Sequence, residues 1–325
     1  MKWYDISERS EQLRPFNFII GGRGIGKTYS TISWLIEQGK PFIYLRNTDT
    51  QMTESCSSFG NPFKRWSLDH GRDIFIQAEG KHYVIKERTG EKETKTLGYA
   101  AALSVFENLR GVDLSECVYC MFDEFIERRS LMFDQFSAFA NFYETVNRNR
   151  ELLGDPPLMC FLLSNAQTLD NPILAGYNII PEIEQMMRAG QRSYTNDLLH
   201  IELPKSEISD AKKQTVNYLM TEGSSYYQEA INNDFAFDSF YNIGKKPIRE
   251  YIPVCSIDGI YIYQHKSTSN YYCCRIQNNK CMEYNSKDNR RMFLQRYGIR
   301  LRMARDAGKL EYSDFTIKSR LNALL

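Results

Sequence analysis

The chain has 325 residues, of which 42% are hydrophobic and 25% charged, and its formal net charge is +1. This composition is typical of ordinary globular proteins and argues against a disordered or fibrous chain. We expect no membrane contact, because no apolar run approaches the ~20 residues of a spanning helix. The first residues also lack the apolar stretch of a signal peptide. The length suggests two domains.

The charges are unevenly distributed along the chain. Residues 236–325 hold 7 Lys and 9 Arg against 8 Asp and Glu, a net charge of +8, so residues 1–235 carry −7. This asymmetry indicates a polyanionic partner for the C-terminal part. The eight cysteines show no convincing metal-ligand spacing, and we expect them to be inert thiols.

A glycine-rich stretch near the N-terminus fits the phosphate-binding pattern G-x-x-x-x-G-K-[ST]. An apolar strand over 16–20 precedes it, and a helix over 28–38 follows and ends at Gly39. Such a unit presents backbone N–H groups to the phosphates of a nucleotide. Lys27 is expected to reach the β- and γ-phosphates, and Thr28 to bind Mg²⁺. The predicted nucleotide-binding residues are Gly21, Gly22, Arg23, Gly24, Ile25, Gly26, Lys27 and Thr28.

Alternating apolar strands and helical periodicity predict an α/β domain with a parallel sheet over residues 1–203. Residues 47–60 are rich in Ser and Thr, and we expect a loop there. A hairpin is expected around Gly80. The remaining elements are strands over 42–45, 98–105, 117–122, 158–163 and 198–203, and helices over 128–150 and 172–190.

The rest of the chain is predicted to be a helical linker over 204–235 and a small α+β domain over 236–325. Strands are expected over 252–276, turning at 258–259 and around 267–270, before a basic helical segment. That segment interleaves arginines with Phe293 and Tyr297, a pattern typical of nucleic-acid binding, although a solvated basic helix face is the alternative. Its candidate binding residues are Arg290, Arg291, Arg296, Arg300, Arg302 and Arg305.

A second motif follows the strand at 117–122, where Asp123 and Glu124 form the Walker B arrangement. Asp123 is expected to bind Mg²⁺, and Glu124 to orient and deprotonate the attacking water. No N-K-x-D motif is present, which argues against a GTPase. Ser164 and Asn165 end a neighbouring strand, where polar groups can contact the γ-phosphate or the water; helix capping is the alternative.

Two arginines, Arg148 and Arg150, end the helix expected over 128–150. An arginine at a subunit edge can stabilise transition-state charge in a neighbour's site. The alternative is favourable charge at a helix C-terminus. The adenine pocket has no clear sequence signal, and Gln12 is only a candidate.

Taken in order and spacing, four segments within roughly residues 16–175 resemble the genome-encapsidation ATPases of small protein-primed podophages (Salasviridae and relatives). The segments are FIIGGRGIGKTY at 18–29, FDEFI at 122–126, TVNRNRE at 145–151, and LSNA at 163–166 with NP at 171–172.

The resemblance implies an ASCE P-loop ATPase, related to large terminases, that uses ATP and Mg²⁺. It implies a ring, a homopentamer in our reading, that sits on the portal of the procapsid in the host cytoplasm and pumps double-stranded viral DNA. Arg148 would then act in trans, and Arg23 would match a terminase arginine that senses the γ-phosphate. A packaging RNA is a further implied partner of the basic segment.

The resemblance also implies a C-terminal domain shaped like an RNase H nuclease but inactive. A two-metal nuclease needs converging carboxylates, and no acid of 236–325 is expected within a convincing apolar strand. Two other functions stay open: a different nucleic-acid motor, such as a helicase or DNA-transfer ATPase, and a nucleotide-controlled nucleic-acid-binding adaptor.

Overall fold

The computed structural model describes residues 2–80, 82–91, 93–109, 113–127, 134–165, 168–205, 207–221 and 242–325. The chain divides into two compact units, residues 1–237 and 238–325. No helix within the described ranges is both long and apolar enough to cross a membrane.

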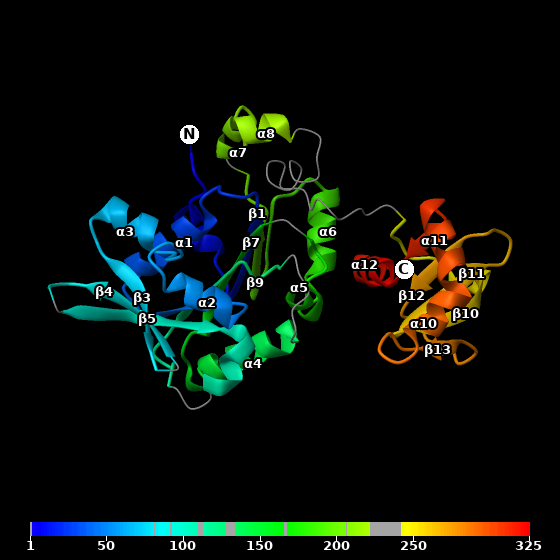
Figure 1. Cartoon of the computed structure of the whole chain (residues 1–325), viewed down its shortest axis with the longest axis horizontal. Helices are drawn as coiled ribbons and strands as arrows, with labels where there is room; N and C mark the ends of the chain where they lie inside the picture. Colours follow the sequence, from blue (N-terminus) through cyan, green and yellow to red (C-terminus); the bar gives the residue numbers. More distant parts are fainter. Residues whose placement is uncertain are drawn as a thin grey trace. The chain divides into compact units, whose positions relative to one another are not determined.

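A nine-stranded sheet organises the first unit (Figure 1), in the order β3-β4-β5-β2-β6-β7-β1-β9-β8. The six strands from β5 to β9 in this order run parallel to one another, and the strands outside them pair antiparallel. The strands are β1 (Phe16–Gly21), β2 (Phe42–Arg46), β3 (Ile74–Glu79), β4 (His82–Arg88), β5 (Thr94–Ala102), β6 (Tyr119–Asp123), β7 (Met159–Asn165), β8 (Ser193–Thr195) and β9 (Leu199–Glu202).

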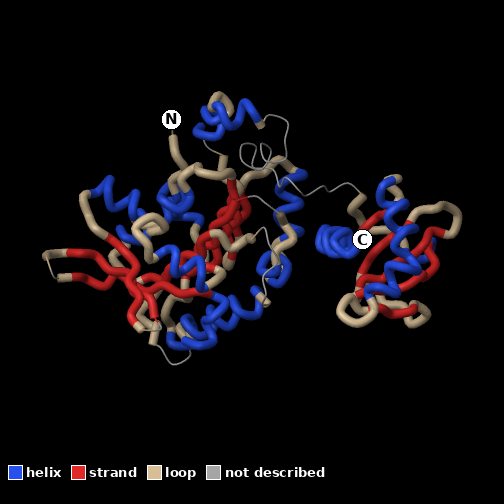
Figure 2. Tube along the Cα trace, viewed as in Figure 1, coloured by secondary structure: helices blue, strands red, loops and turns tan. Residues whose placement is uncertain are grey.

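Helices pack on both faces of this sheet, so the unit has three layers (Figure 2). The α-helices are α1 (Lys27–Glu37), α2 (Asp49–Ser55), α3 (Lys64–His70), α4 (Gln135–Asn147), α5 (Pro172–Gly176), α6 (Ile180–Arg188), α7 (Glu207–Lys212) and α8 (Val216–Met220). The 3₁₀ helices are η1 (Ile6–Gln12), η2 (Leu103–Leu109) and η3 (Glu151–Leu153). The predicted α/β class with a largely parallel sheet is confirmed.

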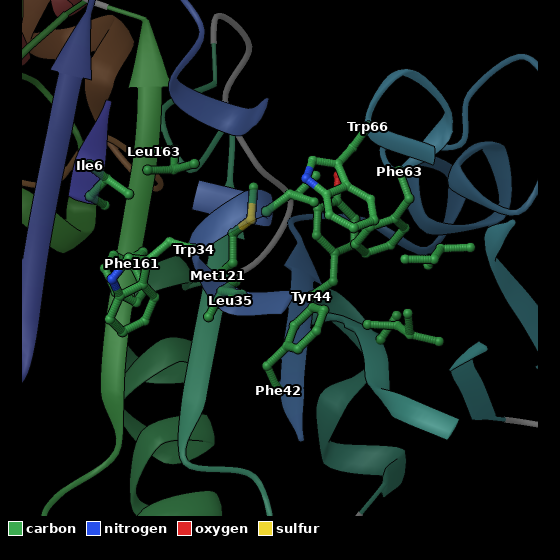
Figure 3. Close-up of a cluster of buried hydrophobic side chains, with 14 of the residues drawn as sticks. Ile6, Trp34, Leu35, Phe42, Tyr44, Phe63, Trp66, Met121, Phe161 and Leu163 are labelled. Atoms are coloured by element: carbon green, nitrogen blue, oxygen red, sulfur yellow. The ribbon is translucent and has the colours of Figure 1, made fainter. Parts of the chain in front are cut away.

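Alternating residues of the central strands point to opposite faces and build two cores. On the face shown in Figure 3, Tyr44 and Phe161 pack with Trp34 of α1 and Trp66 of α3. On the other face, Phe122 stacks on Phe139 of α4, with ring centroids 5.6 Å apart. Each central strand is therefore buried on both sides, which explains its nearly continuous apolar sequence.

The expectation of a loop over 47–60 was wrong, because α2 begins at Asp49. Thr48 caps this helix: its side chain accepts a hydrogen bond from Gln51 N, and the Gln51 side chain accepts one from Thr48 N. This reciprocal capping box outweighs the weak helix propensity of Ser and Thr. Met52 then anchors the helix in the core, where it is fully buried.

The other predicted elements of this unit differ from the structure mainly at their ends. β3 and β4 form the expected hairpin, and residues 172–190 hold α5 and α6. β5 ends at Ala102, and the 3₁₀ helix η2 begins at the next residue. The last three residues of the strand predicted over 98–105 therefore belong to this helix. α4 begins at Gln135, where Asp134 caps it. Residues 128–133 of the predicted helix, 222–235 of the predicted linker and 236–241 of the predicted C-terminal domain lie outside the described residues.

The second unit is built on a five-stranded sheet of order β13-β10-β11-β12-β14. The predicted turns are present between β10 and β11 and between β11 and β12. The strands are β10 (Tyr251–Ile257), β11 (Ile260–His265), β12 (Tyr271–Cys274), β13 (Met282–Tyr284) and β14 (Leu310–Tyr312). The helices are η5 (Ile248–Glu250), α10 (Arg290–Phe293), the π-helix η6 (Leu294–Gly298), α11 (Ile299–Asp306) and α12 (Phe315–Leu324).

Two acids of this unit lie in short strands that were not predicted from the sequence. Glu283 lies in β13 and Glu311 in β14, two strands of three residues that are too short to stand out in the sequence. The two strands form opposite edges of the sheet, so these carboxylates do not converge. Glu283 accepts from Tyr261 OH, and Glu311 pairs with Lys246.

Candidate nucleotide site

The phosphate-binding loop joins β1 to α1 at the carboxyl edge of the parallel sheet. Gly24 and Gly26 have φ values of 63° and 103°, in the left-handed region that favours glycine. Gly26 is also the N-cap of α1, and its carbonyl accepts from Ser30 N at 2.9 Å. The first backbone N–H groups of α1 therefore face the loop, as anion binding requires.

Lys27 is buried beneath this loop, and its ammonium group is held by oxygen atoms. Nζ donates to Gly21 O at 3.0 Å, to Gly22 O at 2.8 Å and to Asn165 Oδ1 at 3.3 Å. Burial lowers the pKa of Lys27 to about 7. A bound polyphosphate would favour the charged form, because opposite charge stabilises the ammonium ion.

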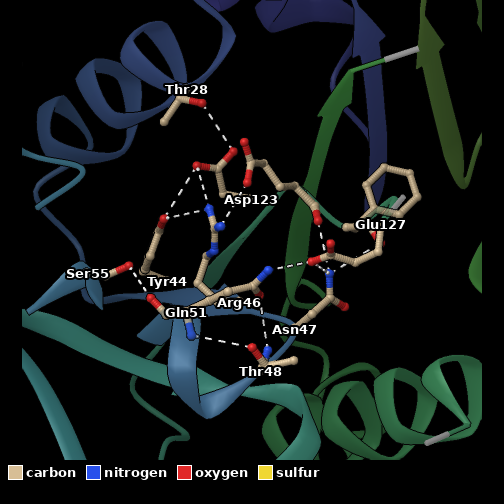
Figure 4. Close-up of polar contacts among 11 residues, drawn as sticks. Thr28, Tyr44, Arg46, Asn47, Thr48, Gln51, Ser55, Asp123 and Glu127 are labelled. Atoms are coloured by element: carbon tan, nitrogen blue, oxygen red, sulfur yellow. Dashed lines mark hydrogen bonds and ion pairs between the residues drawn. The ribbon is translucent and has the colours of Figure 1, made fainter. Parts of the chain in front are cut away.

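Thr28 and Asp123 meet at the position where Mg²⁺ binding was predicted. Thr28 Oγ1 donates to Asp123 Oδ1 at 3.1 Å, and Tyr44 OH lies 3.4 Å from Asp123 Oδ2 (Figure 4). Burial raises the pKa of Asp123, and the charge of Arg46 opposes that rise. A hydroxyl and one carboxylate are the protein ligands that Mg²⁺ uses beside phosphate oxygens. Within the described ranges no cluster of three or more His, Cys, Asp or Glu residues could hold a metal alone.

Glu124 follows Asp123 directly, and its side chain is half exposed to the cavity. Its φ of 55° lies in the left-handed region, which costs a non-glycine residue about 1–3 kcal/mol unless surrounding contacts fix it. Two hydrogen bonds do so: Asn47 Nδ2 donates to Glu124 O at 2.9 Å, and Phe125 N donates to Leu163 O at 3.2 Å. The backbone conformation turns this carboxylate out of the strand.

Arg46 holds both acids of the site and was not among the predicted residues. Its Nη2 lies 2.8 Å from Glu124 Oε2. Its Nη1 lies 3.6 Å from Asp123 Oδ2 (Figure 4). Burial alone would lower the pKa of Arg46, but Tyr44 and the two acids together raise it above its ordinary value. A sequence signal existed, since Arg46 ends β2 at the same sheet edge as Asp123.

Buried side-chain amides connect this edge of the sheet to α4. Gln135, the first residue of α4, donates through Nε2 to Phe125 O and to Asn47 Oδ1, both at 2.6 Å. Gln135 Oε1 accepts from Asn171 Nδ2 at 2.9 Å. Asn47 and Gln135 are fully buried, so these bonds satisfy groups that water cannot reach. The start of α4 is thereby fixed to the loop that carries Glu124.

Ser164 and Asn165 both line the cavity at the end of β7. Asn165 contacts Lys27, and Ser164 Oγ is buried without a hydrogen-bond partner among the described residues. Neither caps α5, because that cap is Asn171, whose Oδ1 accepts from Ile173 N and Leu174 N. The capping alternative is wrong for both residues, and an unsatisfied hydroxyl suits a phosphate or water ligand.

The cavity above the loop measures about 970 Å³. Arg23 is exposed and lines it, together with Lys27, Thr28, Asp123 and Glu124. Gln12, the candidate for the adenine pocket, does not line it; this residue ends η1, and the cavity instead reaches Trp3, Tyr4 and Asp5.

Arg148 and Arg150 lie away from this cavity, at the other end of α4. Arg148 is the C-cap residue, half exposed, and pairs with Asp113 at 3.2 Å. Arg150 donates through Nη2 to the carbonyl oxygens of Ser115 and Cys117. Arg150 is therefore committed to the backbone before β6, whereas the Arg148 guanidinium pairs, among the residues that the structure describes, with the exposed side chain of Asp113.

The predicted basic segment presents its arginines and buries its aromatics. Arg290, Arg291, Arg296, Arg300 and Arg302 are exposed, and Arg305 is partly buried beside Asp306. The expectation that Phe293 and Tyr297 stack on bases was wrong. Both are buried in the core of this unit, where they pack against Tyr284. What remains of the pattern is a set of cations that could contact phosphates.

The sequence of this chain is also similar to those of known proteins. Residues 2–261 match the family described as Podovirus DNA encapsidation protein (Gp16). The chain belongs to this family. It is 29% identical, over 241 residues, to the DNA packaging proteins of Bacillus phages PZA and phi29. The similarity covers 72% of this chain, and the chain spans 66% of the length of those curated relatives.

Two solved structures share the fold along nearly the whole chain. One is the bacteriophage phi29 viral genome packaging motor assembly, with a TM-score of 0.65 and 22% identity over 99% of this chain and 98% of that chain. The other is the Phi-28 gp11 DNA packaging motor, with a TM-score of 0.58 and 14% identity over 99% and 97%. The predicted resemblance to podophage encapsidation proteins is confirmed.

Because Arg46 neutralises the buried Asp123, the Arg46→Ala protein should be less stable without nucleotide. Breaking a buried ion pair costs about 3–5 kcal/mol, so Tm should fall by roughly 5–10 °C. Thermal unfolding of nucleotide-free protein measures this shift. Arg188→Ala is the matched control, since Arg188 is 56% exposed in its pair with Glu184 and should cost below about 0.5 kcal/mol. Equal Tm shifts for the two variants would show that Arg46 stabilises the protein no more than an exposed ion pair does.

Proposed function

We propose that this chain is an ATPase that packages double-stranded viral DNA into a procapsid. The observation that carries the proposal is one cavity, lined by Lys27, Thr28, Asp123 and Glu124, in a chain of the DNA encapsidation family. The relatives named as DNA packaging proteins and the two packaging-motor structures support it.

Each residue of the site has a role in hydrolysis that its position supports. ATP with Mg²⁺ supplies the phosphoanhydride bond that is broken. Lys27 and the N–H groups of α1 would hold the phosphates, while Thr28 and Asp123 would hold the metal. Glu124 would accept a proton from the water as its oxygen bonds to the γ-phosphorus, and ADP would leave with the bridging oxygen. Arg46 Nη2 lies 2.8 Å from the Glu124 carboxylate, and breaking this ion pair would free the base for water.

The family and the charge distribution support the partners that we propose. We infer a ring, a homopentamer, that assembles on the portal of the procapsid in the host cytoplasm. Residues 1–203 would be the ATPase domain, 204–235 the linker, and 236–325 the nucleic-acid-binding domain with a vestigial nuclease-like shape. The net charge of +8 in that last region supports contact with DNA or a packaging RNA.

Two other functions use the same site. A helicase or DNA-transfer ATPase would be stimulated by single-stranded nucleic acid and would separate strands. A nucleotide-controlled adaptor would bind DNA or RNA, hydrolyse slowly and move nothing. The packaging proposal requires stimulation of hydrolysis by double-stranded DNA together with procapsids.

A packaging assay tests the proposal directly. Purified protein, ATP, viral DNA and empty procapsids are combined, and the DNA protected from added nuclease is measured. Wild-type protein should protect full-length DNA, and Lys27→Ala should protect none because it lacks the phosphate-binding ammonium group. Protection that does not depend on ATP, or DNA unwinding without protection, would contradict the proposal.

If the C-terminal unit holds no nuclease centre, the purified protein should leave plasmid DNA intact in Mn²⁺. The positions of Glu283 and Glu311 at opposite sheet edges support this expectation, since two-metal cleavage needs carboxylates around one pair of ions. Supercoiled plasmid is incubated and examined by gel. Cleavage that survives repurification, and that disappears in Glu283→Gln or Glu311→Gln, would overturn the expectation.

A further inference from the structure

The cavity extends beyond the phosphate loop into a region that phosphates alone do not need. Trp3 from the N-terminal segment lines this part, with Tyr29 and Ser33 of α1 and Arg65 and Asp69 of α3. At about 970 Å³ the whole cavity lies at the upper end of the range for small-molecule sites. The cavity therefore has the volume and the lining residues to hold more than the triphosphate group of a ligand.

Trp3 is unusual among the tryptophans of the chain. Its side chain is 56% exposed, whereas Trp34 and Trp66 are 9% and 3% exposed in the core. An indole ring buries a large apolar area when it packs. An exposed ring that lines a cavity therefore offers a contact surface that the chain itself leaves uncovered.

The backbone around Trp3 is fixed, so the ring is not on a loose terminus. Tyr4 N donates to Ile25 O of the phosphate loop at 3.0 Å, and Lys2 N donates to Glu207 Oε2 at 3.0 Å. Tyr4 OH also donates to the buried Glu202 at 2.9 Å. A preorganised aromatic surface binds a ligand without a large ordering cost.

The ring also lies next to the loop on which phosphates would bind. A Cβ placed on Gly26 would come within 3.4 Å of Trp3 Cε3. The polar part of the lining is held together as a group, since Tyr29 OH donates to Asp69 Oδ2 at 3.0 Å and Arg65 pairs with Asp69 at 2.9 Å. A nucleotide with its phosphates on the loop would have its base within this region.

We propose that Trp3 is the surface on which the base of the bound nucleoside triphosphate stacks, with Tyr29, Arg65 and Asp69 lining the rest of the base site. This inference rests on the proposed function, since it requires nucleotide on the phosphate loop. Stacking of a base on an aromatic ring contributes roughly 5- to 150-fold in affinity. It favours every base, so Trp3 provides affinity rather than the choice between bases.

The test compares two ligands that share phosphates but not a base. Calorimetry measures the Kd of ATP and of inorganic tripolyphosphate, both with Mg²⁺, for wild-type protein and Trp3→Ala. We expect Trp3→Ala to weaken ATP binding about tenfold or more and to leave tripolyphosphate binding unchanged. Trp3→Phe keeps a ring and should retain most of the affinity. Phe59→Ala is the matched control, because Phe59 is 90% exposed and does not line the cavity.

Intrinsic fluorescence gives a second readout. ATP should quench wild-type tryptophan emission, tripolyphosphate should not, and Trp3→Phe should lose the ATP response. Unchanged ATP affinity in Trp3→Ala, or equal loss for both ligands, would overturn the inference. The proposed function would survive that result as long as Lys27→Ala weakens both ligands. Wild-type protein that binds neither ligand would overturn the proposed function, and the inference with it.

Discussion

Rings assembled from Arg148→Ala protein should hydrolyse ATP about 10³–10⁵-fold more slowly than wild-type rings, the effect of such arginines in other P-loop enzymes. The substitution leaves the cavity residues of its own subunit unchanged. Nucleotide binding should therefore persist while turnover falls. Steady-state ATPase rates and nucleotide Kd values, measured on assembled rings, distinguish a loss of turnover from a loss of binding.

The position of Arg148 supports action on a neighbouring subunit. Arg150, two residues on, bonds to Cys117 O, before the start of β6, whereas Asp123 ends that strand in the site. Cys117 and Asp123 are six residues apart in extended chain, which corresponds to about 20 Å. Arg148 thus lies near the edge of the sheet opposite to its own cavity.

Mixed rings decide between action in trans and in cis. Rings made only of Arg148→Ala or only of Glu124→Gln subunits should each hydrolyse ATP far more slowly than wild-type rings. Some interfaces of a mixed ring pair an intact Glu124 with an intact Arg148, so activity should return on mixing. Mixed rings that form but show no ATPase activity would indicate that Arg148 acts in the site of its own subunit or only caps α4. Arg150→Ala, run alongside, should lose stability because it removes bonds to Ser115 and Cys117.

Glu124→Gln should bind ATP and cleave it about 10²–10⁴-fold more slowly, because the water loses its general base. The substitution is isosteric, and the side chain is half exposed, so folding should be unaffected. Single-turnover hydrolysis and nucleotide Kd are measured on the same preparation. Glu184→Gln on α6 is the control and should match wild type. Loss of nucleotide binding in Glu124→Gln would contradict the assignment of this carboxylate as the base.

The parts of the site that are contiguous in sequence could be predicted from it. The phosphate loop and the pair Asp123–Glu124 each lie within a few residues, and their spacing carries the chemistry. Arg46 could be placed at this edge of the sheet from the end of its strand, but its pairing with Glu124 could not be predicted, because 78 residues separate the two positions. The same holds for Gln135 and Asn47, which are 88 residues apart and meet only in the folded core.

Two of the wrong predictions could have been avoided, because a short sequence pattern at each place indicated the structure better than the local composition did. Thr48 and Gln51 form the three-residue spacing of a capping box, which predicts a helix where Ser and Thr content suggested a loop. Phe293 and Tyr297 are followed at the same spacing by Leu301, and a repeat of four residues is typical of a buried helix face. The short strands β13 and β14 carried no comparable signal.

α4 has a consequence for how subunits of a ring would take turns. The side chain of its first residue, Gln135, donates a hydrogen bond to Phe125 O, next to Glu124, and Arg148 follows its last residue as the C-cap. The helix has 13 residues and spans about 20 Å as one rigid rod. If Arg148 serves the adjacent subunit, a shift of the Glu124 loop would move the arginine that the next site needs. Each subunit would then time its neighbour mechanically, and turnover would proceed around the ring in a fixed direction.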